Sequence, residues 1–166
     1  MLSMYDFTIP VLKKALTNLS IVLKIGEDYT IAKKIDPNVL LTDRLFPNMF
    51  HLIRQVQVAT DMSKGGAARL GGVEIPKYDD AETSFADLQA RITQTIVFLE
   101  SIKPAQLEGS ETREISFKAG SRDLAFNGQD YLLKWVLPNV YFHVTTTYNI
   151  LRHNGVDLKK IDFLGS

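Results

Sequence analysis

Four stretches of the chain place apolar residues three or four positions apart, which is the spacing of one face of an α-helix. They cover about residues 10–25, 49–70, 85–102 and 128–155. Residues 112–127 change period, because Ile115 and Phe117 alternate with polar residues before a turn, and Leu124 and Phe126 do so after it. The pattern predicts an all-α fold, a four-helix bundle with a small β-hairpin before the last helix, formed by residues 1–166 as one domain.

Capping and breaking residues set the expected limits of these helices. Thr8 can cap the first helix, with Pro10 in its first turn, and Gly26 is expected to end it. Ser84 and Asp87 have the spacing of a capping box at the start of the third helix. Pro138 lies inside the last helix, where it leaves a backbone carbonyl without its usual donor and is expected to kink the helix.

Predictions can also be made for two segments outside the four helices and for one charged residue of the third helix. Residues 73–83 form a polar loop with a proline, a plausible rim for a pocket or an ordinary long connection. Arg91 of the third helix can pair with Asp61 or Glu82 as a structural ion pair. The tail, residues 156–166, contains three large apolar residues and is expected to dock onto the helices or onto a partner subunit.

The last helix carries polar residues in the same row as its apolar ones. Asn139 and His143 are four positions apart, and Thr146 or Thr147 continues the row. An amide, an imidazole and hydroxyls that face a helical core must form hydrogen bonds or bind something. We therefore expect a polar pocket for a metal or a small molecule between the second and last helices.

Metal binding is one interpretation of this row, because ligands four residues apart on a helix form half of a common metal site. Asn139 and His143 would supply that half. Gln55 or His51 of the second helix would supply a third ligand to divalent zinc, nickel or manganese. Neutral amides are poor ligands for such metals. The alternative is a hydrogen-bond network of His143 with Asn139, Gln55 or Tyr148. His143 is also the candidate catalytic residue, since a part-buried imidazole titrates near neutrality.

Composition narrows the range of functions. Lys+Arg and Asp+Glu both number 19, so no net charge favours nucleic acid or an anionic membrane as a partner. The absence of cysteine excludes disulfides, thiolate metal sites and a cysteine nucleophile. The first residues are neither a signal peptide nor a membrane span. A cytoplasmic location is therefore expected.

Four segments together are similar to a known family. They read LFPNMFHLIRQVQVATDMSKGGAARLGG, DDAETSFADLQARI, FNGQDYLLKWVLPNVYFHVTTTYNILRHNGV and DFLG. Over essentially its whole length the chain resembles a bacterial and fungal family of unknown function in the DinB/YfiT-like metalloenzyme superfamily. The resemblance implies four helices in up-down-down-up order, a homodimer, and a divalent metal held by one histidine of the second helix and an HxxxH pair of the last. Some members are thiol-dependent transferases acting on low-molecular-weight thiols, and many have no known activity.

Transferred to this sequence, the resemblance places the second histidine of the HxxxH pair at His143 and the first at Asn139. The histidine of the second helix falls near Gln55, with His51 one turn earlier. Two of the three expected ligands are therefore amides. Two hypotheses follow. One is a metal-dependent enzyme, a hydrolase or thiol transferase with a small-molecule substrate. The other is a metal-free bundle that acts as a binding or dimeric structural module.

Overall fold

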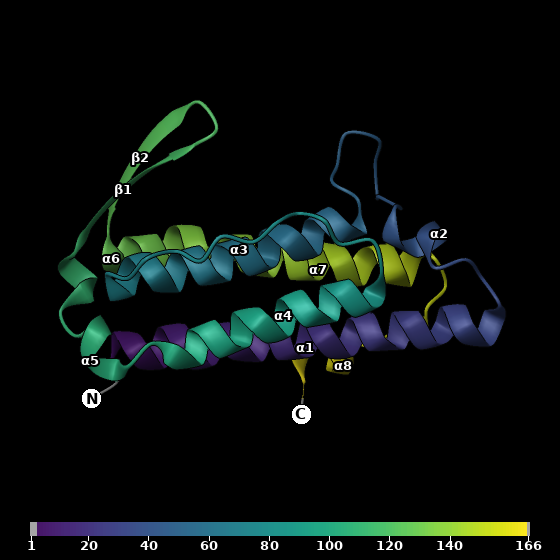
Figure 1. Cartoon of the computed structure of the whole chain (residues 1–166). Helices are drawn as coiled ribbons and strands as arrows, with labels where there is room; N and C mark the ends of the chain where they lie inside the picture. Colours follow the sequence, from purple (N-terminus) through teal and green to yellow (C-terminus); the bar gives the residue numbers. More distant parts are fainter. Residues whose placement is uncertain (1–2, 166) are drawn as a thin grey trace.

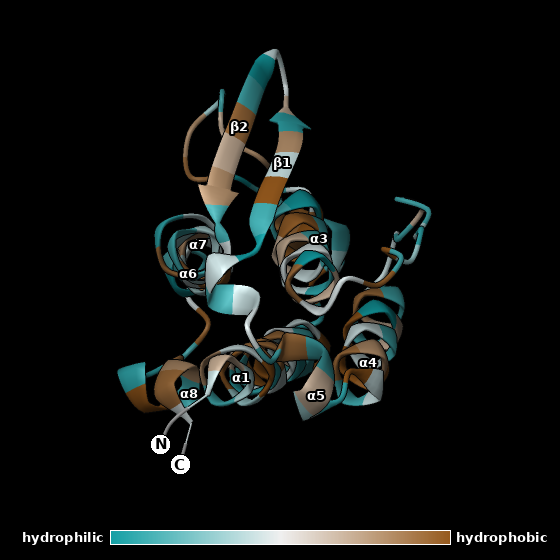
Figure 2. Cartoon of the chain, turned by 90° about the vertical axis from the view of Figure 1, so that its left-hand side faces the viewer, coloured by the Kyte–Doolittle hydropathy of each residue, from teal (hydrophilic) through white to brown (hydrophobic). Residues whose placement is uncertain are grey.

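The computed structural model describes residues 3–165, which are mostly helical and contain one two-stranded antiparallel sheet, as predicted. Four long helical segments dominate this range. They are α1 (Met4–Lys33), α3 (Leu52–Gly71), α4 (Phe85–Ser101) and a composite segment of α6 (Gly128–Asp130), a π-helical stretch (Tyr131–Val136) and α7 (Leu137–His153). In Figure 1, α1 and α7 run from left to right, and α3 and α4 run from right to left. The end view shows them side by side, with α3 between α7 and α4 (Figure 2).

Shorter helices, which the hydrophobic pattern did not predict, connect and cover these segments. They are α2 (Asn38–Leu41), α5 (Pro104–Leu107), a single 3₁₀ turn (Ser110–Thr112) and α8 (Lys160–Leu164). The tail docks as expected, because Asn18 of α1 donates its side-chain N–H to the carbonyl oxygen of Phe163 at 2.9 Å. The ring of Phe163 also packs edge-on against Tyr148 of α7, with 6.3 Å between ring centroids.

Helix α1 begins earlier and ends later than predicted. Ser3 rather than Thr8 caps it, in a reciprocal capping box with Asp6, so Pro10 lies within the helix. Gly26 does not end it but is buried inside it, where a Cβ would lie 2.9 Å from Leu151 of α7. The missing side chain therefore permits close packing of two helices. None of the helices within residues 3–165 has both the length and the apolar character needed to cross a membrane.

The disturbance predicted at Pro138 takes the form of a π-helical stretch. Pro138 has no N–H to return to the carbonyl four residues earlier, so regular α-helical bonding fails at this point. The backbone directly before α7, Tyr131–Val136, instead winds in the wider π form. This stretch turns Tyr131, Leu132 and Val136 into the core, where each is at most 2% exposed.

The predicted hairpin consists of β1 (Glu114–Ala119) and β2 (Arg122–Asn127), with Ile115 opposite Phe126 and Phe117 opposite Leu124. It projects from one end of the helices, next to α6 (Figure 1). Phe117 anchors it by packing edge-on against Tyr131 and Trp135, with ring centroids 5.5 and 5.6 Å away. A pair of strands is not stable alone, so this aromatic cluster holds the hairpin in place.

Candidate functional site

Two of the predicted site residues meet between α3 and α7. His143 of α7 is 8% exposed, and its Nδ1 lies 2.7 Å from Oε1 of Gln55 on α3, which is 1% exposed. The side-chain N–H of Gln55 donates to the carbonyl oxygen of Phe50 at 2.9 Å. That bond assigns Oε1 of Gln55 as an acceptor, so Nδ1 of His143 carries the proton and donates it. The other ring nitrogen, Nε2, therefore keeps its lone pair.

The imidazole of His143 is neutral at pH 7. Burial, together with the positive charge of Arg54, lowers the pKa of His143 to about 4. A ring with this pKa is not in the acidic imidazolium form at neutral pH, and its neutral form is a weak base. The arrangement therefore favours hydrogen bonding by His143 over general acid–base catalysis at neutral pH.

The hydrogen bonds of Asn139 and His51 go to groups other than this pair. The side-chain N–H of Asn139 donates to the carbonyl oxygen of Trp135, one turn earlier on its own helix, at 2.7 Å. His51 is the cap of α3, because its Nδ1 accepts a hydrogen bond of 3.4 Å from the backbone N–H of Arg54. Burial and the positive charges of Arg44 and Arg54 also lower the pKa of His51. The structure thus brings together His143 and Gln55, and uses the other two predicted residues in local backbone contacts.

These residues do not fit a divalent metal ion. Within residues 3–165, no group of three His, Asp or Glu side chains is placed to hold one. Oε1 of Gln55 already accepts a hydrogen bond from His143, and the Asn139 amide is directed to its own helix. His51 uses its Nδ1 to cap α3, so the His143–Gln55 pair offers one strong metal-donor atom, Nε2 of His143, and a single imidazole makes a weak zinc, nickel or manganese site.

The hydroxyls of the predicted polar row are satisfied within α7. Thr146 donates to the carbonyl oxygen of Phe142 at 2.7 Å, and Thr147 donates to that of His143 at 2.9 Å. Such bonds to the preceding turn are usual for threonine in helices. The two threonines therefore help to hold the backbone of His143 but add no group to the site.

Two exposed phenylalanines contact the His143–Gln55 pair, Phe142 through its ring and Phe50 through its backbone carbonyl. Phe142 is 56% exposed and meets the imidazole of His143 edge-on, with 5.2 Å between ring centroids. Phe50 is 52% exposed, and the guanidinium of Arg54 lies 5.7 Å from its ring centroid. We call Phe50, Phe142 and Arg54 the rim. The hydrophobic pattern gave no signal for the rim, because exposed aromatic rings lie outside a buried stripe.

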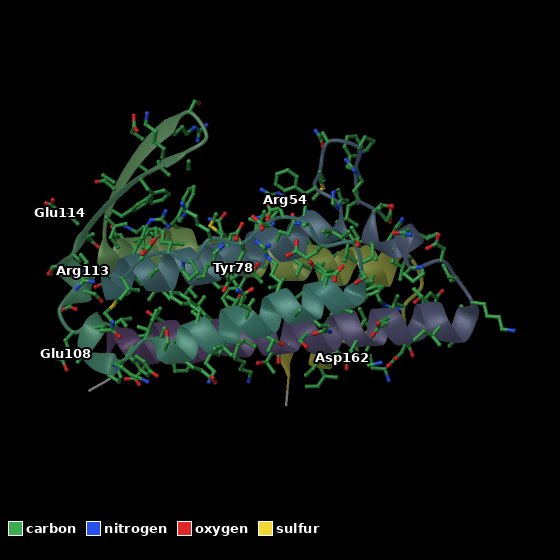
Figure 3. All side chains as sticks on the ribbon, viewed as in Figure 1. Arg54, Tyr78, Glu108, Arg113, Glu114 and Asp162 are labelled. Atoms are coloured by element: carbon green, nitrogen blue, oxygen red, sulfur yellow. The ribbon has the colours of Figure 1, made fainter. Side chains whose placement is uncertain are left out.

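Arg54 also connects the rim to a network of charges around Arg91 of α4. Its guanidinium bonds Oε1 of Gln57 at 3.1 Å and pairs with Asp80. Gln57 in turn donates to Glu82 at 2.8 Å. The loop of residues 73–83 supplies both carboxylates, so it helps to hold the rim in place. It runs along α3 in Figure 1, and Figure 3 labels Tyr78 within it.

Arg91 of α4 is the centre of this network. Its side chain is 2% exposed and pairs with Asp61 and Glu82, each at 2.8 Å, as the sequence predicted, and with Asp80 at 3.2 Å. Burial alone would lower the pKa of Arg91, but its three carboxylate partners raise it overall. Likewise, burial alone would raise the pKa of Glu82, but hydrogen bonds from Arg91 and Gln57 lower it overall. These pairs fasten the loop to α3 and α4.

Comparison with known proteins decides the family. A family model described as "Domain of unknown function (DUF1993)" matches residues 4–164. The chain belongs to the DUF1993 family. This DUF1993 chain is also similar to a crystal structure of a DinB family member protein from Shewanella denitrificans. The two are 41% identical, the match covers 98% of this chain and 92% of that one, and the TM-score is 0.91. No protein with a curated description matches the chain. The resemblance inferred from the sequence is thereby confirmed.

Proposed function

We propose that this DUF1993 chain is a single-domain, up-down-down-up helical bundle whose α3–α7 site binds a small organic molecule without a metal. The observation that carries the proposal is the buried hydrogen bond of 2.7 Å between His143 and Gln55. It holds a neutral imidazole in one orientation and one tautomer, with a free lone pair on Nε2. A fixed acceptor of this kind is the usual specificity element in a binding site.

The surroundings of His143 suggest the class of ligand. Nε2 accepts a hydrogen bond, so a matching molecule carries an O–H or N–H group. Phe50 and Phe142 are half-exposed and offer apolar contact to the rest of that molecule. The charge of Arg54 is partly neutralised by Asp80, so it does not demand an anion. We therefore propose an aromatic or aliphatic molecule with a hydroxyl or amide donor.

The second candidate is the metal-dependent hydrolase or thiol transferase that the superfamily resemblance implies, in a homodimer. It is supported by the position of His143, which matches the second histidine of the superfamily's pair, and by the free Nε2. The available metal ligands make this candidate less favourable, because Asn139 and Gln55 are amides that already form hydrogen bonds.

Metal analysis and thermal unfolding of purified protein separate the two candidates. Protein prepared without chelators is expected to contain no stoichiometric ion and to gain no melting temperature from zinc, nickel or manganese, because binding to the folded state alone would raise it. One equivalent of an ion that His143→Gln loses and His153→Gln keeps would contradict the proposal. His153 is a suitable control because it is exposed near the end of α7.

Ligand binding is tested with pairs of aromatic fragments, such as phenols and their methyl ethers, by ligand-observed NMR. We expect fragments with a donor to bind, their methyl ethers to bind at least about tenfold more weakly, and His143→Leu to remove the difference. A preference that His143→Leu retains would place the site elsewhere.

A further inference from the structure

A cavity lies beyond the N-terminal end of α7, away from the His143 site. It has a volume of about 610 Å³ and is formed by the start of α1, α5, the following 3₁₀ turn and the π-helical stretch. Leu132 and Leu133 on its wall precede His143 by about ten residues, which is about 15 Å along a helix. Its size is typical of sites for small molecules.

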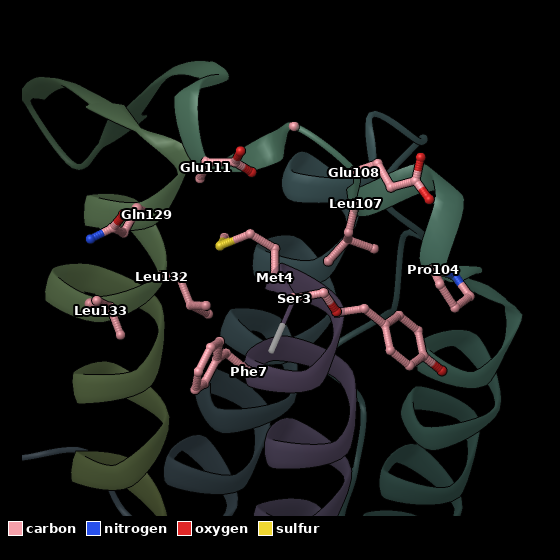
Figure 4. A pocket seen from close by; sticks show the side chains of 12 residues that line it. Ser3, Met4, Phe7, Pro104, Leu107, Glu108, Glu111, Gln129, Leu132 and Leu133 are labelled. Atoms are coloured by element: carbon pink, nitrogen blue, oxygen red, sulfur yellow. The ribbon is translucent and has the colours of Figure 1, made fainter. Parts of the chain in front are cut away.

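The walls of this cavity are mainly apolar. Met4 and Phe7 of α1, Leu107 of α5, and Leu132 and Leu133 line it. Figure 4 shows Met4, Leu107 and Leu132 around the same space. Phe7 and Leu133 are 45% and 50% exposed, so both present apolar surface to solvent at this cavity. An apolar ligand body would cover both.

The charged residues that line the cavity are both acidic. Glu108 and Glu111 line it, and Figure 4 places both along one edge. No lysine, arginine or histidine is among its lining residues. The carboxylates that form ion pairs within residues 3–165 all lie outside this cavity. The two glutamates therefore leave a negative charge next to an apolar surface.

We propose that this cavity binds an amphiphilic ammonium compound, with its cationic head at Glu108 and Glu111 and its apolar body against Phe7 and Leu133. Charge complementarity selects the cation, because an anion would meet two like charges and a neutral molecule would gain nothing from them. The apolar wall selects a body of several carbon atoms over a small hydrated cation.

Three probes of nearly the same shape test the proposal by titration calorimetry on the full chain: 4-phenylbutylammonium, 4-phenylbutanol and 4-phenylbutanoate. We expect the ammonium compound to bind about tenfold more tightly than the alcohol, with no measurable binding of the carboxylate, since each glutamate contributes up to about fivefold. The preference should shrink at high salt, because both carboxylates are exposed.

Matched variants locate the binding. The double change Glu108→Gln and Glu111→Gln should equalise the ammonium compound and the alcohol, whereas Glu74→Gln, an exposed charge elsewhere, should not. Leu133→Asn should weaken both probes, and the control Val97→Asn, which changes a residue 60% exposed on α4, should weaken neither. Equal affinity for all three probes, no binding of the ammonium compound, or a preference that survives the double change would each overturn the proposal. None of these outcomes depends on the His143 site.

Discussion

Lowering the pH from 7 to 5 should destabilise the protein through His143. The pKa of His143 is about 4 in the folded protein, against an ordinary value of 6.5. Between these two values the unfolded chain binds a proton that the folded protein does not, so unfolding becomes easier as the pH falls. The stability contributed by the neutral imidazole is therefore present above pH 6.5 and is lost as the pH falls toward 4.

The size of the effect follows from the two pKa values. Their difference corresponds to about 3 kcal/mol once both states are protonated, and about 2 kcal/mol of it falls between pH 7 and pH 5. Carboxylates with lowered pKa values, Glu82 and Asp87, titrate mainly below this range. His51, whose pKa is also lowered, adds a change of the same sign above pH 5, so the part due to His143 is obtained as a difference from a variant without its imidazole.

Urea unfolding at pH 7, 6 and 5 measures this contribution as a difference between proteins. Wild type should lose about 2 kcal/mol more than His143→Gln, which keeps a hydrogen-bonding side chain but cannot titrate. His153→Gln should behave like wild type, because His153 is exposed. Parallel pH profiles for wild type and His143→Gln would refute the assignment of a neutral, buried imidazole.

Three substitutions test contacts that support the fold. Gly128→Ala would place a Cβ 1.8 Å from the carbonyl oxygen of Ser110, so it should cost about 3 kcal/mol in chemical unfolding; wild-type stability would contradict the packing. Arg91→Met should cost about 3 kcal/mol by removing the buried cation that pairs with three carboxylates, of which Asp61 keeps Lys64 and Asp80 keeps Arg54; a stable variant would show that the network contributes little. Phe117→Ala should cost about 2 kcal/mol and shift the fluorescence of Trp135, the only tryptophan; an unchanged spectrum would mean that the hairpin packs otherwise.

The sequence predicts most of the helical content because each long helix carries a repeating apolar stripe and local capping signals. Ser84 and Asp87 form the capping box that their spacing indicates. The limits of α1 could not be predicted in the same way. Gly26 looks like a helix terminator locally, but contact with Leu151, far along the chain, keeps it inside the helix. Tertiary packing overrides the local preference at that position.

The candidate site could be predicted only in part for a related reason. Helical spacing places His143 on the inner face of the last helix, and the structure buries it there. The spacing of residues does not predict the orientation of a side chain. The side-chain amide of Asn139 donates a hydrogen bond to the backbone of its own helix instead of to the site. Gln55, one of the partners that the sequence suggests for His143, comes from α3, and the two residues become neighbours only through the fold.

The protonation state of His143 is the most direct test of the neutral, metal-free site. Long-range ¹H–¹⁵N correlation spectra of the imidazole report which ring nitrogen carries the proton and at which pH the ring titrates. We predict a neutral ring at pH 7 with the proton on Nδ1, a midpoint well below pH 6, and no change on adding one equivalent of zinc. A proton on Nε2, a midpoint near 6.5, or a zinc-dependent shift of both nitrogens would contradict the site described above.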